Sequence, residues 1–183
     1  SRKFDPNLVQ GGNLDVGNSK YDFSKFNLYT DFNDMIAKET LDYIDIALPT
    51  YLHCYYACRA MEAGISVLCE KPMALDPEQC ERMISTSEKT GKTLMIAQCL
   101  RFWPAYEFLK DTLASNELGS PVFGYFYRGG GGAPQWSYQD WAKDHHRSGG
   151  CLLDQHVHDI DIVNHMFGMP DAVSAMGRNV IPG

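Results

Sequence analysis

The sequence predicts an α/β fold built on a parallel sheet. Strand-like and helical patterns alternate between residues 43 and 97, and only a few residues separate one element from the next. The apolar run Val67 to Cys69 reads as a buried strand, and it stops abruptly at Glu70-Lys71-Pro72. Strands that alternate with helices in this way are joined by right-handed crossovers and lie parallel.

The composition is that of an ordinary globular protein, with 44% hydrophobic and 21% charged residues in 183. A formal charge of -7 argues against nucleic acid or an anionic membrane as the main partner, because both require a basic surface. No apolar run approaches the ~20 residues that cross a bilayer. The six cysteines lack Cys-x-x-Cys spacing, so we expect reduced thiols in a cytoplasmic protein.

The N-terminal part has only weak patterns. Residues 1–26 are rich in Gly, Asn and Ser, which indicates loop. Residues 27–30 are compatible with a short strand. A helix through Phe32, Met35 and Ile36 is expected next, with Asp31 or Thr30 as its N-cap.

The central part predicts three strands and two helices. Gly64 is placed to end the first helix. The second has a strong start, because Asp76 can be its N-cap and Gln79 completes a capping box, and Gly91 closes it. In chain order the elements are strand 43–48, helix 52–63, strand 66–69, the helix from Pro77, and strand 93–97.

Polar side chains gather where the three strands end. Parallel strands bring these ends to one edge of the sheet, and ligands of open α/β sheets bind beyond that edge. For Glu70 and Lys71 alone, a surface ion pair at a turn is an equally good interpretation. The sheet needs no polar cluster there for its stability, whereas a ligand site does. The residues expected at this edge are Thr50, His53, Glu70, Lys71, Gln98 and Arg101.

The second half of the chain differs in character. An amphipathic helix is expected through residues 106–113, ending near Gly119. Residues 121–127 alternate with aromatics and predict a strand of a different sheet. The loop 129–149 opens with four glycines, but these lack the strand–G-x-G-x-x-G–helix context of a phosphate-binding turn. Its aromatics, Trp136 and Trp141 among them, either stack on a sugar or pack as a lid.

Residues 151–167 predict one continuous helix, ended by Gly168. A carboxylate one turn from an imidazole can fix its tautomer and raise its basicity, so Asp154 and His158 form a candidate acid–base pair. The alternative interpretation of this pair is a polar helix face that is exposed to solvent and has no catalytic role. The polar stripe comprises Asp154, His158, Asp161 and His165, and the residues expected to face the core are Leu153, Val157, Ile160 and Phe167.

His156 falls on the apolar side of such a helix. We expect it to be a hydrogen-bonded core histidine, unless the helix starts later and frees it. An alternative function is a hydrolase in which His156 and His158, with Asp154 and His145, bind zinc or iron. Helix geometry opposes this, because neighbours two apart point to different sides of a helix.

Two stretches together resemble the glucose–fructose oxidoreductase/inositol dehydrogenase (Gfo/Idh/MocA) family. The first is DYIDIALPTYLH at 42–53 followed by AGISVLCEKP at 63–72, and the second is GGCLLDQHVHDID at 149–161. The resemblance implies an incomplete Rossmann parallel sheet, followed by part of an α/β domain with a mainly antiparallel sheet. By this resemblance residues 1–100 are part of an NAD(P)-binding domain, and residues 101–183 part of a substrate, catalytic and oligomerisation domain.

The resemblance also implies an activity and a set of site residues. The activity is hydride transfer between NAD or NADP and a sugar, polyol or related hydroxy compound, by a homo-oligomer without a metal. A non-catalytic ligand-binding member of the same fold is the alternative. Carried over by position, the catalytic residues are Lys71, Asp154 and His158; the cofactor-binding residues are Pro49, Thr50, His53, Glu70, Lys71, Pro72 and Gln98; and the substrate-side residues are Arg101, Trp136, Trp141 and His158.

The chain departs from the family pattern in two respects. The family's Gly-rich fingerprint and its usual C-terminal remainder are absent, so we expect an interior fragment that binds dinucleotide poorly by itself. His156 stands where many members carry a small residue, which changes the shape expected on the substrate side.

Overall fold

The computed structural model describes residues 26–129 and 137–178. The chain forms two compact units, one ending at Leu41 and the other beginning at Asp42. The first unit contains helix α1 (Phe32–Lys38), and the Asp31 carboxylate accepts a hydrogen bond from the Asp34 backbone N–H at 3.0 Å. This confirms the predicted helix and selects Asp31 as its N-cap.

The strand predicted for residues 27–30 is wrong, because this segment is irregular. Its polar side chains bind locally. The Asn27 amide donates to the Glu39 carboxylate at 2.7 Å, and the Tyr29 hydroxyl donates to the same oxygen. These bonds fasten the segment to the end of α1 in place of a strand ladder.

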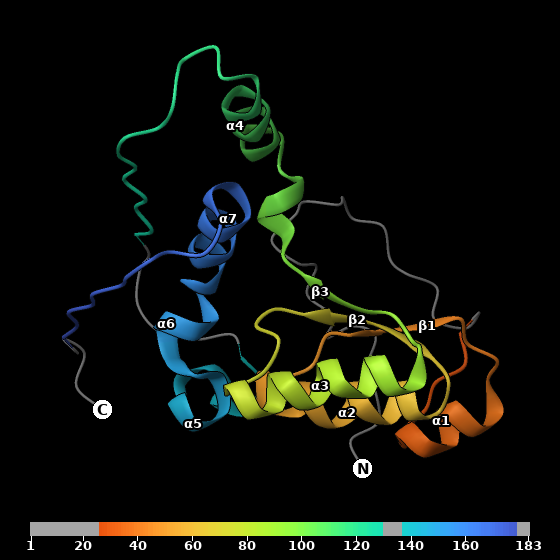
Figure 1. Ribbon diagram of the computed structural model, residues 1–183. Coiled ribbons are helices and arrows are strands. Elements are labelled where there is room, and N and C mark those ends of the chain that lie inside the picture. Colours follow the sequence, from red (N-terminus) through yellow and green to blue (C-terminus); the bar gives the residue numbers. More distant parts are fainter. Residues whose placement is uncertain (1–25, 130–136, 179–183) are drawn as a thin grey trace, which may run out of the picture. The chain divides into compact units, whose positions relative to one another are not determined.

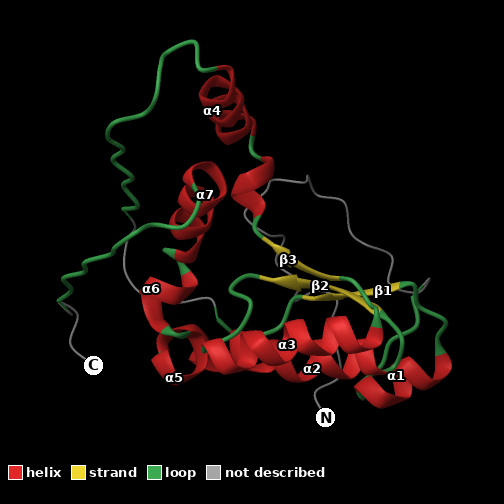
Figure 2. Cartoon of the chain, in the orientation of Figure 1, coloured by secondary structure: helices red, strands yellow, loops and turns green. Residues whose placement is uncertain are grey.

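The second unit is built on the predicted parallel sheet. Its strands are β1 (Tyr43–Ile46), β2 (Ser66–Glu70) and β3 (Leu94–Ala97), in the order β1-β2-β3 (Figure 1). Helices α2 (Thr50–Glu62) and α3 (Pro77–Thr90) lie side by side against one face of the sheet (Figure 2). The α/β class is therefore confirmed, although each strand differs by a residue or two from its predicted bounds.

The starts and ends of the helices follow from local chemistry. At α3 the Asp76 carboxylate accepts from the Gln79 backbone N–H at 2.8 Å, as predicted. The Gln79 side chain departs from a capping box, because it donates to the Asp76 carboxylate at 2.7 Å. Gly91, at φ 66°, ends α3 in the left-handed conformation that glycine adopts most easily.

The core lies between the sheet and its two helices. Val67 and Cys69 from β2 meet residues of α2 and α3, and none of these side chains is more than 2% exposed. Alternation along the strands puts Val67 and Cys69 on the helix-covered face. Burial of such side chains stabilises the fold by about 1.5–3 kcal/mol each. The helix residues in this core include Ala57, Met61 and Met83.

The region after β3 begins with a short 3-10 turn, η3 (Cys99–Phe102), and helix α4 (Pro104–Ser115). The strand predicted for residues 121–127 is wrong for this structure. The segment is extended but irregular, and Val122 and Phe123 are 99% and 86% exposed. Alternating sequence predicts a strand, but a strand forms only beside a partner, and the described part of the chain supplies none here.

The predicted continuous helix 151–167 is also wrong, because the segment forms two helices. These are α6 (Gly150–Asp154) and α7 (Val157–Phe167), and His156 is the N-cap of α7. Ile162 is buried at 1% exposure, whereas Ile160 and Phe167, both expected in the core, are 46% and 45% exposed. Before α6 lie η4 (Tyr138–Lys143) and α5 (His145–Ser148).

No helix among the described residues is long and apolar enough to cross a bilayer. All six cysteines are unpaired, and Cys54, Cys58 and Cys69 are buried. Burial raises the pKa of the Cys69 thiol to about 12, which keeps it protonated and unreactive.

Candidate functional site

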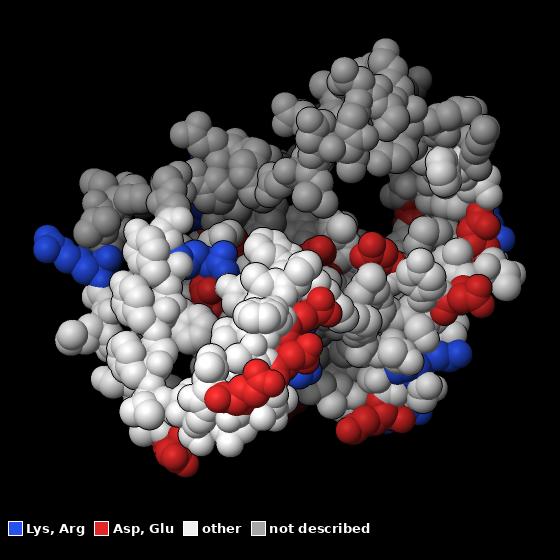
Figure 3. Space-filling model, turned by 90° about the horizontal axis from the view of Figure 1, so that it is seen from above, with Lys and Arg blue, Asp and Glu red and all other residues white. Residues whose placement is uncertain are grey.

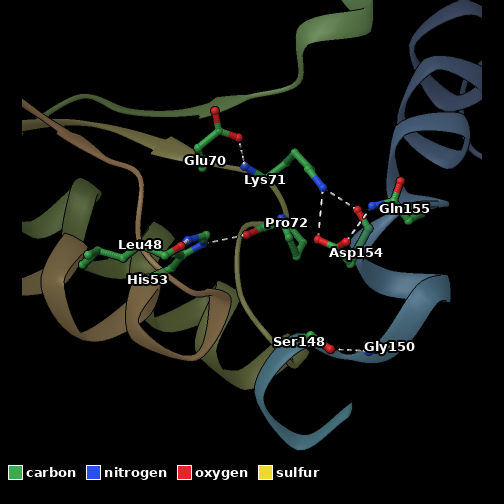
Figure 4. A network of polar contacts seen from close by, with 9 residues as sticks. All are labelled: Leu48, His53, Glu70, Lys71, Pro72, Ser148, Gly150, Asp154 and Gln155. Carbon is green, nitrogen blue, oxygen red and sulfur yellow. Dashed lines mark hydrogen bonds and ion pairs between the residues drawn. The ribbon is translucent and has the colours of Figure 1, made fainter. Parts of the chain in front are cut away.

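Lys71 and Asp154 meet across 83 positions of sequence. Lys71 follows directly after β2, and Asp154 ends α6 (Figure 4). The Lys71 Nζ donates to the Asp154 backbone carbonyl at 2.5 Å and to its Oδ1 at 3.1 Å. Both side chains are largely buried, at 16% and 18% exposure. The sequence analysis placed both residues in one site, and the structure brings them together.

The same contact explains why the helix predicted at 151–167 is interrupted. In a continuous helix the Asp154 carbonyl would accept from the His158 backbone N–H. Lys71 donates to this carbonyl instead, and the backbone N–H groups of Gln155 and His156 both donate to the Cys151 carbonyl. The break therefore coincides with the site.

The predicted pairing of Asp154 with His158 is wrong. Asp154 binds Lys71 through Oδ1 and accepts from the Gln155 amide through Oδ2 at 2.7 Å. His158 has a buried Nδ1 that finds no hydrogen-bond partner among the described residues. Burial lowers the pKa of His158, and the nearby positive charges of Lys71 and Arg128 lower it further. The imidazole is therefore neutral at neutral pH.

His53 has a different environment at the sheet edge. It is 1% exposed; its Nδ1 lies 2.9 Å from the Pro72 carbonyl oxygen and its Nε2 lies 2.7 Å from the Leu48 carbonyl oxygen (Figure 4). These carbonyls belong to the segments that follow β2 and β1. His53 therefore ties two strand ends together, and neither ring nitrogen is left for a ligand.

Three buried side-chain atoms lack a hydrogen-bond partner in the part of the chain that the structure describes. They are Thr50 Oγ1, Gln98 Oε1 and His158 Nδ1. Buried polar atoms are nearly always paired, so unpaired ones call for an explanation such as a ligand or water. All three belong to residues that the sequence analysis assigned to the site, and Thr50 and Gln98 lie beyond the ends of β1 and β3.

The other predicted site residues have varied environments. Arg101 forms a two-pronged ion pair with Asp161, at 2.8 and 2.5 Å. Glu70 is exposed and accepts from the Lys71 backbone N–H at 3.2 Å. Trp141 is half-buried in η4, while Trp136 lies outside the described residues. Pro49 precedes α2, and Pro72 is buried.

A cluster centred on Asp159 was not predicted from the sequence. This carboxylate is 7% exposed; it accepts from Arg128 at 2.6 and 2.9 Å, and His156 Nδ1 lies 3.0 Å from Oδ2. The Arg128 guanidinium lowers the pKa of Asp159. The expected core histidine is wrong: His156 is exposed because α7 begins after it, the case that the sequence analysis left open. No spacing signal links Arg128 to a residue 31 positions away.

The described residues contain no group of three or more His, Cys, Asp or Glu side chains placed to hold a metal ion. The alternative metal site at His156 and His158 therefore has no cluster to support it. On the face shown in Figure 3, acidic and basic side chains lie scattered between uncharged ones. Its described part offers no continuous basic surface of the kind that nucleic acid requires.

Two family models match consecutive parts of the chain. Residues 15–98 match the oxidoreductase family with an NAD-binding Rossmann fold (GFO_IDH_MocA), and residues 106–183 match the GFO/IDH/MocA C-terminal domain. The chain belongs to the Gfo/Idh/MocA family. The resemblance drawn from the sequence motifs is thereby confirmed.

Relatives of this Gfo/Idh/MocA chain have several activities. It is 30% identical to a 2,7-anhydro-N-acetylneuraminate hydratase of Mediterraneibacter gnavus, over 82% of this chain and 40% of that protein. It is 33% identical to a D-xylose 1-dehydrogenase [NADP(+)] of Haloarcula marismortui, over 68% of this chain and 35% of that protein. The chain thus spans at most two fifths of the length of either relative.

Solved structures agree with the fold. The WlbA (WbpB) dehydrogenase of Thermus thermophilus, in complex with NAD and UDP-GlcNAcA, superposes with a TM-score of 0.66 at 25% identity. The match covers 82% of this chain and 50% of that one.

Proposed function

We propose that this chain forms the core of an NAD(P)-dependent oxidoreductase that acts on the CH–OH groups of a sugar, a polyol or a related hydroxy compound. One observation carries the proposal. In the part of the chain that the structure describes, three buried polar atoms have no partner, and they belong to residues at the carboxyl edge of the sheet (Thr50 and Gln98) or beside Lys71 (His158). The carboxyl edge of an open parallel sheet is where such folds bind ligands.

The residues fit a nicotinamide cofactor at that edge. A hydroxyl and a carboxamide oxygen suit a ligand that offers both donors and acceptors, as a nicotinamide ribose does. When bound, the nicotinamide accepts the hydride in oxidation or donates it in reduction. Thr50 and Gln98 would hold the cofactor side of the site, together with Pro49, Glu70 and Pro72.

Lys71 and His158 have complementary roles in this proposal. The Lys71 ammonium has three donors, and two are used by Asp154, so one remains for the reacting oxygen. Asp154 holds the Lys71 side chain in place through these two hydrogen bonds. His158 is neutral because burial lowers its pKa, so it can take the hydroxyl proton at neutral pH.

The substrate class rests on the family and its relatives. A D-xylose dehydrogenase and a dehydrogenase bound to a nucleotide sugar are both similar to this chain. Arg101 and Trp141 would lie on the substrate side. We further propose that residues 1–100 serve the cofactor, that residues 101–183 serve the substrate and oligomerisation, and that the protein works as a homo-oligomer.

The test is a screen of sugars and polyols with NAD and NADP on the purified protein, read by absorbance of the reduced nicotinamide. Because one relative is a hydratase, the products are also analysed for addition of water. We expect turnover in the wild type, and a loss of roughly 10³-fold or more in Lys71→Met. The matched control is Lys110→Met, which removes a lysine that lies beside His165 on the surface.

Nicotinamide binding is measured separately by calorimetry on the same variants. Lys71→Met should retain it, because the unpaired atoms of Thr50 and Gln98 are untouched. Because we expect this stretch to bind dinucleotide poorly by itself, the screen and the calorimetry use the full-length protein, and absence of binding by its wild type would contradict the cofactor assignment. Full turnover by Lys71→Met would contradict only the role given to Lys71.

A further inference from the structure

Arg147 connects three segments of the second unit. Its Nη2 donates to the Tyr51 hydroxyl at 3.0 Å, and its guanidinium carbon lies 4.8 Å from the centre of the Tyr51 ring. Its Nη1 donates to the Gln139 backbone carbonyl at 3.2 Å. One side chain on α5 therefore binds to both α2 and η4.

The η4 end of this contact is a strained turn. Gln139 and Asp140 have φ of 53° and 52°, in the left-handed region, where a residue other than glycine costs about 1–2 kcal/mol. The turn is supported from inside by Ser137, which is 8% exposed and accepts from the backbone N–H groups of Asp140 and Ala142. Trp141 follows immediately. External bonds must offset the strain, and Arg147 supplies one of them.

The α2 end of the contact lies beside the proposed cofactor edge. Tyr51 is the second residue of α2, next to Thr50, whose buried hydroxyl bonds to no other residue that the structure describes. Arg147 therefore joins the helix start that holds Thr50 to the turn that holds Trp141. Only a forked, planar cation can donate in two directions and also stack on the ring, so lysine would be a poor replacement.

We infer that Arg147 is a positioning residue: through Tyr51 and Gln139 it fixes the turn that bears Trp141 against the start of α2. If the proposed function holds, substrate binding depends on the contacts of Arg147, whereas cofactor binding does not; this consequence rests on the proposed function. Arg147 itself does not contact the reacting atoms.

The first test needs no activity. Hydrogen exchange of the purified protein is followed by mass spectrometry in peptides covering residues 137–144, where the amides of Asp140, Ala142 and Asp144 are hydrogen-bonded. We expect exchange about tenfold faster in Arg147→Met, the size that loss of a charge-assisted hydrogen bond produces. Exchange in β1 to β3 should not change. The matched control is Arg82→Met, an exposed arginine on α3.

Intermediate variants sharpen the test. Tyr51→Phe removes the hydroxyl and keeps the ring, so exchange should rise less than in Arg147→Met. Arg147→Lys should resemble Arg147→Met more than the wild type. Exchange at residues 137–144 that is unchanged in Arg147→Met would overturn the inference.

The second test measures steady-state kinetics with the substrate found in the screen. We expect the KM for substrate to rise about tenfold in Arg147→Met, while kcat and the KM for cofactor stay within about twofold. Faster exchange without a change in the substrate KM would overturn the link to substrate binding. A wild type without turnover would count against the proposed function, and the exchange result would still decide whether Arg147 holds the turn.

Discussion

The two sides of the candidate site use their histidines in opposite ways. On the sheet side, His53 lies with both ring nitrogens against backbone carbonyls, those of Leu48 and Pro72. On the helical side, the buried Nδ1 of His158 has no partner within residues 26–129 and 137–178, and burial lowers the pKa of this histidine. Each imidazole lies beside Lys71 or the residue after it.

The difference between His53 and His158 shows how one site can combine a rigid backbone with side chains that are available to a ligand. A buried polar group that is satisfied within the chain stabilises the backbone around it, whereas one left unsatisfied costs free energy until a ligand completes it. His53 belongs to the first kind, and Thr50 and Gln98, at the same sheet edge, belong with His158 to the second. The sheet edge therefore combines a hydrogen-bonded frame at His53 with polar groups, on Thr50 and Gln98, that can bind a ligand.

Replacing His158 should have the largest effect on activity. We expect His158→Gln to lower kcat by roughly 10²- to 10⁴-fold, because a positioned acid–base group contributes this much. Stability should hardly change, since the replaced nitrogen makes no hydrogen bond. The measurement is steady-state turnover beside urea unfolding. His165→Gln, on the exposed end of the same helix, is the control; equal losses in both variants would contradict the role of His158.

Replacing His53 should do the reverse. His53→Leu removes the imidazole from between the carbonyls of Leu48 and Pro72. A neutral imidazole has one N–H and donates to one of these carbonyls at a time, so the variant loses one such hydrogen bond, at a cost of about 1–3 kcal/mol. We expect the free energy of unfolding to fall by about 1–3 kcal/mol, measured by urea titration. A loss under about 0.5 kcal/mol would mean that this bond is weak or replaced by water.

Thr50→Val is the matched comparison, one turn away on α2. It removes a buried hydroxyl without a partner, so stability should stay the same or rise by up to about 1 kcal/mol. NAD(P) affinity should fall about three- to tenfold, the value of one ordinary hydrogen bond. If Thr50→Val destabilised the protein as much as His53→Leu, buried polar groups with and without a partner would not differ in their contribution to stability.

Glycine substitutions test the same two regions at the backbone. Gly149, between α5 and α6, and Gly91, at the end of α3, have similar positive φ of 76° and 66°. A Cβ on Gly149 would lie 2.7 Å from Leu153 Cβ, whereas a Cβ on Gly91 would meet nothing within 4 Å. Gly91→Ala should cost about 1–2 kcal/mol from backbone strain, and Gly149→Ala a further 1–3 kcal/mol or so from overpacking.

Urea titration of both glycine variants measures the difference. Because the strain is common to both, the difference isolates the contact with Leu153. Equal costs would show that Leu153 moves away freely and that this side of the site is less rigid than the distances indicate.

The features that could be predicted from the sequence depend on residues that are close together in the sequence. Asp76, Pro77 and Gly91 mark the bounds of α3 without help from the rest of the fold, and the structure agrees. The meeting of Thr50 and Lys71 at one edge followed from the parallel order of the strands, which short connections impose.

What could not be predicted depends on distant partners. Residues 151–167 contain neither proline nor glycine, so nothing local announces the break at Gln155, which coincides with the Lys71 contact. The ion pair of Arg128 with Asp159 likewise joins residues that no spacing relates. The alternation at 121–127 was real, but a strand also needs a partner that local pattern cannot supply.

The smallest expected effects concern pH, and they separate the Asp159 cluster from His158. Arg128 lowers the pKa of Asp159 in the folded protein, so the unfolded state binds its proton first as the pH falls. The stability that Asp159 contributes is therefore complete above the unfolded pKa of about 3.9, and it is lost as the pH falls through the folded value.

His158 has the same sign in a higher window. Its folded pKa is lowered by burial, so stability should decline as the pH falls below the unfolded value of about 6.5. Unfolding free energies measured from pH 8 to pH 3 test both windows. Asp159→Asn should flatten the curve near pH 4 and His158→Gln near pH 6. If His158→Gln left the slope near pH 6 intact, the imidazole would be as well solvated in the folded state as in the unfolded one, and the burial assigned to it would be wrong.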